Sequence, residues 1–481
     1  MSQGKKVYIT TTLPYVNAEP HVGFAMELVR ADVINRFKKI LGNDVFFNTG
    51  TDEHGVKIFQ KAVEEGKDAQ QFVDERSEKF WDLIELLNIN QDVHFIRTTD
   101  DVHIKAAQEM WRRCKANGDI EKKIYKTKYC IGCELEKTDS ELVDGHCTIH
   151  PNLEIEIRDE ENYFFKFSKY QQKLLDLYKN NPDFVTPSSR LNEIKMFTER
   201  GVEDFSISRL KEKMPWGVPV PDDEGHVMYV WFDALVSYIS TLGWPDESGD
   251  FGKYWTKDNE IIQYAGKDNL RQQSAMWQAM LMSAGLPNSK HIVINGFITS
   301  GGQKMSKSLG NVINPREVVD VFGAESFRYF VARELSSFED SDFTMEAFKQ
   351  AYNSNLANGL GNLVSRLMNL SAKYLDKPVE ITNTSLPDEF VALLNNFSIQ
   401  LAMNMIWKKI GVMDQEIQEK EPFKLIKTDP EKAKAIVHSL VIDLHLLAIM
   451  LEPFMPETSK GIKSLIENNS SPVQPLFPRM D

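Results

Sequence analysis

The sequence predicts an α/β protein with a doubly wound, Rossmann-like parallel sheet, a zinc-binding insertion and a C-terminal α-helical bundle. Three observations lead to this prediction. Short β-branched runs alternate with helical apolar spacing near the N-terminus, a cysteine-containing stretch interrupts that alternation, and the last part of the chain has helical spacing alone. Ligands of doubly wound sheets bind beyond the carboxyl ends of the strands, so the fold class also predicts where a site lies.

The N-terminal alternation starts with a β-branched strand at residues 7–12, which ends at Leu13-Pro14. The apolar residues of the next stretch share one face of a helix; they are Ala25, Leu28, Val29, Val33, Ile34 and Phe37. A second strand, residues 44–48, runs into the polar sequence TGTDEHG. TTTLPY and TGTDEHG are therefore expected as loops at the ligand-binding edge of the sheet.

The pattern changes twice further along the chain. From about residue 114 to residue 221 the charge is dense and the apolar runs are short, which indicates an insertion. The α/β pattern returns in MYVWFDAL, EIIQYAGKD and HIVINGF. From about residue 348 the apolar residues share helix faces, which predicts a helical bundle; they include Leu356, Leu360, Leu363, Val364 and Leu367, and Ile436, Leu440, Leu444 and Leu447.

Composition favours a soluble cytoplasmic protein with no membrane association. MSQGKK leads straight into VYITTT without a long apolar region, so no signal peptide is expected. The most apolar long window, residues 433–451, contains Lys434, His438, Asp443 and His445, which favours a buried helix over a membrane span. The net charge of -14 neither indicates nor excludes a nucleic-acid partner, because phosphate contacts need only a local cluster of Lys and Arg.

Cysteines in the insertion have the spacing of a metal site. Cys130-x-x-Cys133 is followed by Cys147-x-x-His150, and two such pairs can place four ligands tetrahedrally around Zn²⁺. Four protein ligands close the coordination shell, so the zinc would be structural. The alternative is a set of scattered cysteines without a metal role. Cys114 is outside the pattern and is expected as a buried free thiol.

The segment Pro20-His21-Val22-Gly23 follows the first predicted strand and suits a nucleotide site. A glycine lets an adenine ring lie against the backbone, a helix N-terminus favours phosphate, and an imidazole can donate to phosphate oxygens. Alone, the segment fits equally well a helix N-terminus that needs a small residue.

A second candidate for nucleotide chemistry is the glycine-rich sequence GGQKMSKS, residues 301–308. Its two ammonium groups, Lys304 and Lys307, could neutralise charge on a transferring phosphoryl group and on departing pyrophosphate. The alternative is an ordinary solvated loop.

Together, HVG and KMSKS resemble the HIGH and KMSKS signatures of class I aminoacyl-tRNA synthetases. Within that class the chain is most similar to the methionyl-tRNA synthetase family, in LPYVNAEPHVG, TGTDEHG, YCIGCE with CTIH, SISR, PWGVPVP, YVWFDAL, AGKD and NLVSR. The similarity extends from about residue 6 to about residue 456. It implies a class I fold and the ATP- and Mg²⁺-dependent attachment of L-methionine to its tRNA through methionyl-adenylate.

The resemblance also implies roles for individual residues. The positions that match the methionine site are Leu13, Tyr15, Asp52, Trp231, Ala234, Leu235, Tyr238 and Gln273. Asp52 would hold the ammonium group, and aromatic and aliphatic walls suit a thioether, although core packing is the usual role of such residues. The positions that match the ATP site are His21, Gly23, Gly266, Asp268, Lys304 and Lys307. His21, Lys304 and Lys307 would be catalytic, with Lys307 the first candidate for transition-state stabilisation.

The sequence departs from the family pattern at three positions. Phe24 replaces the final His or Asn of HIGH, and Gln273 replaces a histidine beside the methionine side chain. Phe423 replaces a tryptophan where the anticodon stacks, and a phenylalanine can still stack. Asp52 and both lysines remain, so these departures indicate a divergent branch that keeps its activity.

In the helical tail, Asn362 and Arg366 are four residues apart and share a helix face. The resemblance implies that they read anticodon bases beside Phe423; the alternative is ordinary helix surface. The family's C-terminal dimerisation domain is not seen, which predicts a monomer. The expected segments are 1–115 and 226–310 as the two halves of the catalytic sheet domain, 116–225 as the insertion with a zinc knuckle, 311–347 as a KMSKS-linked stem-contact region, and 348–481 as the anticodon-binding domain.

Two other functions compete with this prediction. A small-molecule nucleotidyltransferase shares the HxGH sheet, but the cysteine insertion, KMSKS and the helical tail argue against it. A non-catalytic, synthetase-like tRNA-binding paralogue is supported by Phe24 and Gln273 and opposed by Asp52, Lys304 and Lys307.

Overall fold

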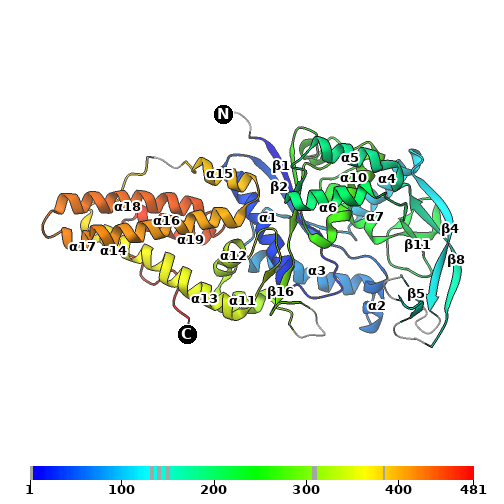
Figure 1. Ribbon diagram of the computed structural model, residues 1–481, viewed down its shortest axis with the longest axis horizontal. Helices are drawn as coiled ribbons and strands as arrows, with labels where there is room; N and C mark the ends of the chain where they lie inside the picture. Colours follow the sequence, from blue (N-terminus) through cyan, green and yellow to red (C-terminus); the bar gives the residue numbers. More distant parts are fainter. Residues whose placement is uncertain are drawn as a thin grey trace.

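The computed structural model describes residues 4–130, 135–137, 142–147, 152–305, 311–382 and 385–480 (Figure 1). Its centre is a parallel sheet with the strand order β3-β2-β1-β14-β15-β9. The strands are β1 (Lys6–Thr10), β2 (Asp44–Thr51), β3 (His94–Arg97), β9 (Val185–Thr186), β14 (Glu260–Gly266) and β15 (His291–Asn295). The strand order reverses between β1 and β14, so the loops after these two strands meet at a topological switch point.

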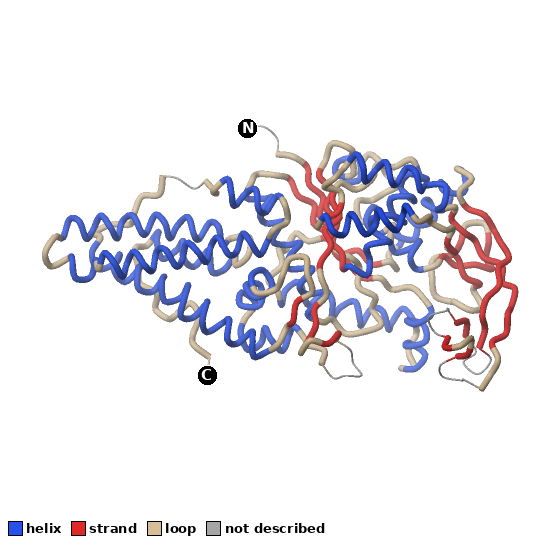
Figure 2. Tube along the Cα trace, in the orientation of Figure 1, coloured by secondary structure: helices blue, strands red, loops and turns tan. Residues whose placement is uncertain are grey.

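Alternate side chains of β1 enter two different cores. Val7 and Ile9 pack with α1 (Val22–Ile40) and with the C-terminal helices. Tyr8 points to the opposite face, where α4 (Asp101–Ala116) and α10 (Trp277–Ala284) lie. This is the period of two expected of a strand. Helices therefore cover both faces, and the predicted doubly wound parallel sheet is confirmed (Figure 2).

The second predicted strand, residues 44–48, is too short. β2 continues to Thr51, so the first three residues of TGTDEHG are strand and not loop. Thr49, Gly50 and Thr51 pair in parallel with β3, a strand that the sequence pattern did not predict. The backbone hydrogen bonds of a neighbouring strand decide this boundary, and a single-strand pattern does not contain them. After TGTDEHG come α2 (Val56–Glu64) and α3 (Ala69–Leu86).

The insertion is built around one long antiparallel pair, β4 (Ile120–Cys130) with β8 (Ile155–Phe165). β5 (Leu135–Lys137) and β10 (Phe205–Ser206) extend it, and β6 (Leu142–Val143) pairs with β7 (His146–Cys147). Cys130 and Cys147 are buried, whereas Cys133 and His150 lie outside the described residues. Cys114, on α4, is buried as predicted, and burial raises the pKa of its thiol to about 12.

Further elements connect the insertion to the sheet and to the bundle. Between β8 and β14 lie η2 (Phe167–Tyr170), α5 (Gln171–Asn180), α6 (Ser188–Glu199), β11 (Ser208–Leu210), β12 (Pro219–Val220), β13 (Asp223–Met228), α7 (Val230–Ala234), α8 (Ser237–Ser240) and α9 (Asp250–Tyr254). After β14 come η3 (Lys267–Asn269) and the π-helical η4 (Gln272–Met276), and after β15 come β16 (Ile298–Ser300), β17 (Gln303–Lys304), α11 (Pro315–Phe322), α12 (Ala324–Arg333) and β18 (Ser341–Asp342).

The end of the chain forms the predicted helical bundle, which extends away from the sheet on the side opposite β4 and β8 (Figure 1). Its elements are α13 (Met345–Ala351), the π-helical η6 (Tyr352–Gly361), α14 (Asn362–Tyr374), α15 (Asp388–Asn395), α16 (Ile399–Lys420), α17 (Pro422–Leu425), α18 (Pro430–Leu451) and α19 (Pro456–Glu467). Leu363, Val364 and Leu367 are buried together with Leu440, Leu444 and Leu447, so the apolar stripes of α14 and α18 meet in one core.

Among the described helices, α18 has the length and apolar composition of a membrane span. Half of its most apolar 18-residue stretch is buried inside the protein. The helix packs against α14, α16 and α19, so it is a core helix of the bundle, as its polar residues predicted.

Candidate functional site

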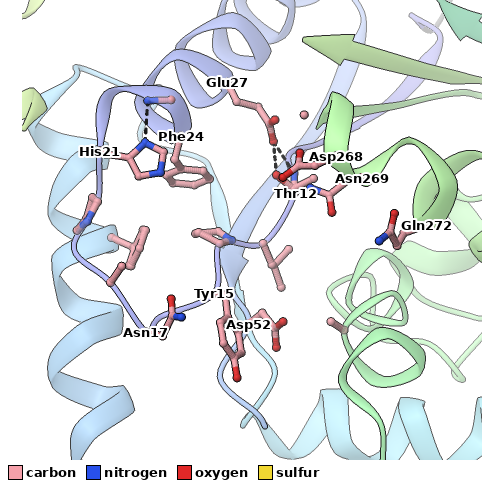
Figure 3. A pocket seen from close by; sticks show the side chains of 18 of the residues that line it. Thr12, Tyr15, Asn17, His21, Phe24, Glu27, Asp52, Asp268, Asn269 and Gln272 are labelled. Carbon is pink, nitrogen blue, oxygen red and sulfur yellow. Dashed lines mark hydrogen bonds between the residues drawn. The ribbon is translucent and has the colours of Figure 1, made fainter. Parts of the chain in front are cut away.

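A cavity of about 780 Å³ lies at the carboxyl ends of the parallel strands. Thr12 to Pro14 follow β1, Asp52 follows β2, and Gly266 ends β14, and all of them line it. The cavity brings together every described residue that the resemblance assigned to methionine or to ATP, apart from Lys304; these are Leu13, Tyr15, His21, Gly23, Asp52, Trp231, Ala234, Leu235, Tyr238, Gly266, Asp268 and Gln273. Figure 3 shows His21 and Phe24 at one side, Glu27 and Asp268 at another, and Tyr15 beside Asp52.

The structure describes only one of the two lysines of KMSKS. Lys304 is the last residue of the strand β17, and the structure describes its backbone but not its side chain. Lys307 lies outside the described residues. Met305, the next residue after β17, lines the cavity. The described part of this segment therefore reaches the cavity edge.

His21 caps the first turn of α1. Its Nδ1 accepts a hydrogen bond from the backbone N–H of Gly23 at 3.0 Å (Figure 3). With Nδ1 used as an acceptor, the proton of the neutral ring is on Nε2, which is then a donor. The ring is open to the cavity, but the protein around it lowers the pKa of the imidazole by burial. His21 and the N-terminus of α1 together offer N–H donors to an anion.

Gly23 has a packing reason to be glycine. A Cβ at this position would lie 2.8 Å from His21 Cε1 and 2.9 Å from His21 Nδ1, so it would displace the capping ring. This packing requirement is a second reason for glycine at position 23, besides the close approach of a nucleotide that the sequence suggested.

Glu27 is a buried acid at the cavity wall that the motifs did not reveal. Its Oε1 accepts hydrogen bonds from Thr12 N at 2.7 Å and from Thr12 Oγ1 at 2.6 Å (Figure 3). Burial, with Asp268 nearby, raises the pKa of Glu27 to about 7. A signal was present in the sequence, because Gly23 and Glu27 are four residues apart and share one face of α1.

Asp52 is the second buried acid at the cavity. Its backbone bridges to the loop after β1, with Asp52 N donating to Pro14 O at 2.9 Å and Val16 N donating to Asp52 O at 3.2 Å. Its Oδ1 is buried and has no hydrogen-bond partner among the described residues. Burial first, and then the charges of Asp233 and Glu53, raise the pKa of Asp52 well above its usual range. A buried carboxylate oxygen without a hydrogen-bond partner is costly, and a cationic ligand would reduce that cost.

One apolar wall of the cavity comes from residues 229–238, which include α7 and the start of α8. Leu235 and Tyr238 are buried, whereas the Trp231 side chain is 44% exposed and is therefore not a core residue. Gln273, on η4, donates through Nε2 to the Tyr238 hydroxyl, and its buried Oε1 has no hydrogen-bond partner in the part of the chain that the structure describes. Aromatic and aliphatic surfaces with one amide at their end can hold a flexible apolar side chain.

Phe24 lines the cavity at the position of the missing HIGH imidazole. Its ring meets Phe80 of α3 edge-on, with the centroids 5.6 Å apart and the planes at 72°. Phe24 therefore contributes to packing between α1 and α3 in addition to facing the cavity.

The predicted anticodon residues lie on the bundle, away from the cavity. Arg366 Nη1 is 2.5 Å from Asp414 Oδ1 of α16, and about a third of its side chain is exposed. Asn362 is exposed on the same helix, and Phe423, on the short α17, is 41% exposed. Figure 1 shows α17 at the end of the bundle farthest from the sheet.

Zinc ligands cannot be assigned from the described residues alone. The described residues contain no group of three or more His, Cys, Asp or Glu side chains that could hold a metal ion. Two of the four predicted ligands, Cys133 and His150, lie outside these residues. The zinc site therefore stays a prediction.

Comparison with known proteins agrees with the geometry. Residues 7–154 and 132–368 match the family model described as tRNA synthetases class I (M), and residues 366–474 match the anticodon binding domain of methionyl tRNA ligase. The methionine–tRNA ligase of Thermotoga maritima is 40% identical over 95% of this chain and 74% of that protein. The enzyme of Brucella suis is 38% identical over 96% of this chain and 92% of that protein.

A solved structure is also similar over the whole chain. It is Mycobacterium tuberculosis methionyl-tRNA synthetase in complex with methionyl-adenylate, with a TM-score of 0.86 and 36% identity. The match covers 99% of this chain and 100% of that one.

Proposed function

The chain belongs to the methionine group of the class I tRNA synthetases, and from this membership we propose that it attaches L-methionine to its tRNA, using ATP, through methionyl-adenylate. The observation that carries the proposal is one cavity, which the buried Asp52 carboxylate and the capped N-terminus of α1 both face; Asp52 Oδ1 has no hydrogen-bond partner among the described residues. One end suits an ammonium group and the other suits a phosphate.

The first step joins methionine to AMP. A carboxylate oxygen of methionine attacks the α-phosphorus of ATP, the new O–P bond forms, and pyrophosphate leaves with the electrons of the broken P–O bond. Asp52 would hold the ammonium group, and Trp231, Ala234, Leu235 and Tyr238 would enclose the thioether. Mg²⁺, bound with ATP, would offset the negative charge of the phosphates.

Residues of the ATP side would stabilise the charge that develops in this step. His21 would donate from Nε2 to a phosphate oxygen, because its Nδ1 is engaged by Gly23 N. Gly266 would allow the nucleotide close to the backbone, and Asp268 would accept from ribose hydroxyls. Lys304 and Lys307 would neutralise the transferring phosphoryl group and the leaving pyrophosphate.

The second step transfers methionine to tRNA. The oxygen of the terminal adenosine's 2′-hydroxyl would attack the activated carbonyl, its proton would pass to the departing phosphate, and AMP would leave with the electrons of the broken C–O bond. A separate general base is not required by the described geometry, since positioning and charge stabilisation supply much of such a reaction's acceleration. Asn362, Arg366 and Phe423 would contact the anticodon from the bundle.

A structural zinc in the insertion completes the proposal. Cys130, Cys133, Cys147 and His150 would hold it, and it would fix the tip of the insertion. The burial of Cys130 and Cys147 at the ends of β4 and β7 fits thiolate ligands. We also propose the domain limits given above, a monomeric state and a cytoplasmic location.

Pyrophosphate exchange tests the central proposal. Each of the twenty amino acids is supplied in turn with ATP and labelled pyrophosphate, and only methionine should support exchange without tRNA. Exchange with no amino acid would favour the tRNA-binding paralogue. AMP transfer to another small acceptor would favour the nucleotidyltransferase, which the match to an anticodon-binding domain opposes.

A further inference from the structure

A buried carboxylate outside the cavity connects two of the cavity's walls. Asp233, on α7, has no exposed surface. Its Oδ2 lies 2.7 Å from His54 Nδ1, and its Oδ1 lies 2.7 Å from His103 Nε2. His103 Nδ1 lies 3.0 Å from Ser240 Oγ. Because an ionised carboxylate only accepts, both imidazoles donate to Asp233.

The charge of Asp233 is stable in this environment. Burial alone would raise its pKa, but His54 and His103 lower the pKa of Asp233 to about 2. The group is therefore ionised at neutral pH, and both of its oxygens are engaged. A hydrogen bond to a charged group is among the stronger ones in a protein.

The hydrogen bond between His54 and Asp233 connects the loop after β2 with α7. His54 follows Asp52 by two residues, on the loop after β2. Asp233 lies between Trp231 and Ala234 on α7. Asp52, Trp231 and Ala234 line the cavity, so the His54–Asp233 bond joins the proposed ammonium site to the proposed side-chain wall.

The position of the Asp52 carboxylate depends on the two residues that follow it, Glu53 and His54. The residue after it, Glu53, is fixed by Arg97 at 2.8 and 2.9 Å, and Trp216 Nε1 donates to Glu53 O at 2.7 Å. A hydrogen bond from the His54 backbone opposes the rise that burial causes in the pKa of Asp52. Asp52 Oδ1 has no partner of its own among the described residues. His54 is therefore the link between Asp52 and α7.

We propose that Asp233 and His54 are positioning residues for the amino acid, which set the separation between Asp52 and the Trp231–Ala234 wall. The inference rests on the proposed function, because it assumes that the amino acid occupies the cavity. His103 meets the other oxygen of the same carboxylate from α4, and residues of α4 are not among those that line the cavity. It therefore serves as the structural comparison.

The test begins by measuring methionine-dependent pyrophosphate exchange with the unmodified chain. If this exchange is absent, the proposed function is rejected, which is a different outcome from failure of the positioning role. His54→Ala should then raise KM for methionine by about tenfold or more, since a charge-assisted hydrogen bond is lost. KM for ATP and kcat should stay within about twofold, because the affected wall holds the amino acid only. His54→Asn should recover most of the loss, since its amide N–H can take the place of Nδ1–H.

Two comparisons separate positioning from simple stabilisation. His103→Ala should lower the melting temperature and His103→Gln, which keeps an N–H donor near Asp233, should lower it less, and neither should change KM for methionine. L-Methioninol and 4-(methylthio)butan-1-ol, which differ by the amino group, should be compared as competitive inhibitors. His54→Ala should weaken inhibition by the first far more than by the second.

Equal changes in KM for methionine in the His54 and His103 variants would overturn the proposal, as would an unchanged KM in His54→Ala. Equal weakening of both alcohols would overturn it as well. If His54→Ala does not fold, Asp233→Asn and His54→Asn provide the same comparison, with a raised KM expected in the first and a nearly normal KM in the second.

Discussion

Arg328 Nη2 lies 2.8 Å from Asp32 Oδ2, and neither side chain has any exposed surface. Asp32 lies on α1, the helix that His21 caps, and Arg328 lies on α12. Arg328 also donates to Phe454 O at 2.7 Å and to Leu87 O at 3.2 Å. The pair thus joins α1 to the segment that precedes α19. Burial would raise the pKa of Asp32, but Arg328 and Arg36 lower it.

Removing one partner of this pair should be costly. Arg328→Met leaves the buried Asp32 carboxylate with Arg36, 2.8 Å away, as its remaining ion-pair partner, so the free energy of unfolding should fall by an amount at the lower end of about 3–5 kcal/mol. Urea denaturation of the variant and of the unmodified chain measures the change. The double variant Asp32→Asn, Arg328→Met should recover part of the loss, because both charges of the fully buried pair are removed together. A double variant less stable than Arg328→Met would contradict this account.

The same pair makes a prediction about acid. The pKa of Asp32 is lower in the folded chain than its ordinary value of about 3.9. Its contribution to stability is therefore complete above that pH and is lost as the pH falls through the folded value. Asp32→Asn should flatten this acid dependence of the free energy of unfolding.

Lys307→Ala tests the proposed transition-state role of the KMSKS segment. Loss of one such donor removes about 2.7–4 kcal/mol of stabilisation, so kcat for exchange should fall about 10²–10³-fold. The melting temperature should hardly change, because the proposed role of Lys307 is to contact the phosphates of ATP and not to support the fold. Lys460→Ala, at an 80% exposed side chain on α19, is the matched control and should exchange normally. Activity of Lys307→Ala within a few-fold of the unmodified chain would reject the role.

The zinc prediction is tested by metal analysis. The purified chain should contain one zinc, and Cys130→Ser should lose it because one of four ligands is gone. Cys114→Ala is the matched control, since Cys114 is also buried but lies outside the motif. It should keep the metal. A chain with no zinc near stoichiometry would show that the cysteines have another role.

The fold was largely predictable because its strong signals are local. β1, α1 and the apolar stripes of α14 and α18 follow directly from the spacing of apolar residues. β3 and β9 were not predicted, since they are short and are defined by pairing with β2 and β15. The hydrogen bonds that define such short strands come from distant parts of the chain.

The cavity was predictable only where a motif marked it. HVG, TGTDEHG, YVWFDAL and AGKD all contribute to it. Glu27 was missed although it shares a helix face with Gly23, and Asp233 was missed because its partners His54 and His103 are far away in the sequence. His54 and Asp233 are 179 positions apart, and no local pattern relates them.

Phe24→His tests whether the departure from HIGH is mild. An imidazole at the phosphate end of the cavity should keep exchange at or above the activity of the unmodified chain, with a KM for ATP that is equal or lower. The edge contact with Phe80 is lost, which should cost about 0.5–1.5 kcal/mol of stability. Phe24→Leu, which loses the ring without adding a donor, separates these two effects. A large loss of exchange in Phe24→His alone would show that the pocket has rearranged around phenylalanine.

The last prediction concerns how an acidic protein selects its tRNA. We expect Arg366 and Asn362 to read anticodon bases from one helix, with Phe423 stacking nearby. Bases of a single-stranded loop are splayed out and can be bonded along their edges. Arg366 offers a rigid fork, of which only Nη1 is directed at Asp414. A good base contact is worth about 1–3 kcal/mol, so Arg366→Ala should lower tRNA charging about tenfold or more. Exchange without tRNA should be nearly unchanged, because the cavity lies in another part of the molecule.

The ion pair with Asp414 supplies the control that separates recognition from support. Asp414→Ala removes the 2.5 Å contact but leaves the guanidinium in place. If Arg366 contacts tRNA, charging should fall much more in Arg366→Ala than in Asp414→Ala. If Arg366 only braces α14 against α16, the two variants should lose charging and thermal stability equally, because they break the same pair. If charging stays normal in both, Arg366 is ordinary helix surface and the anticodon is read elsewhere.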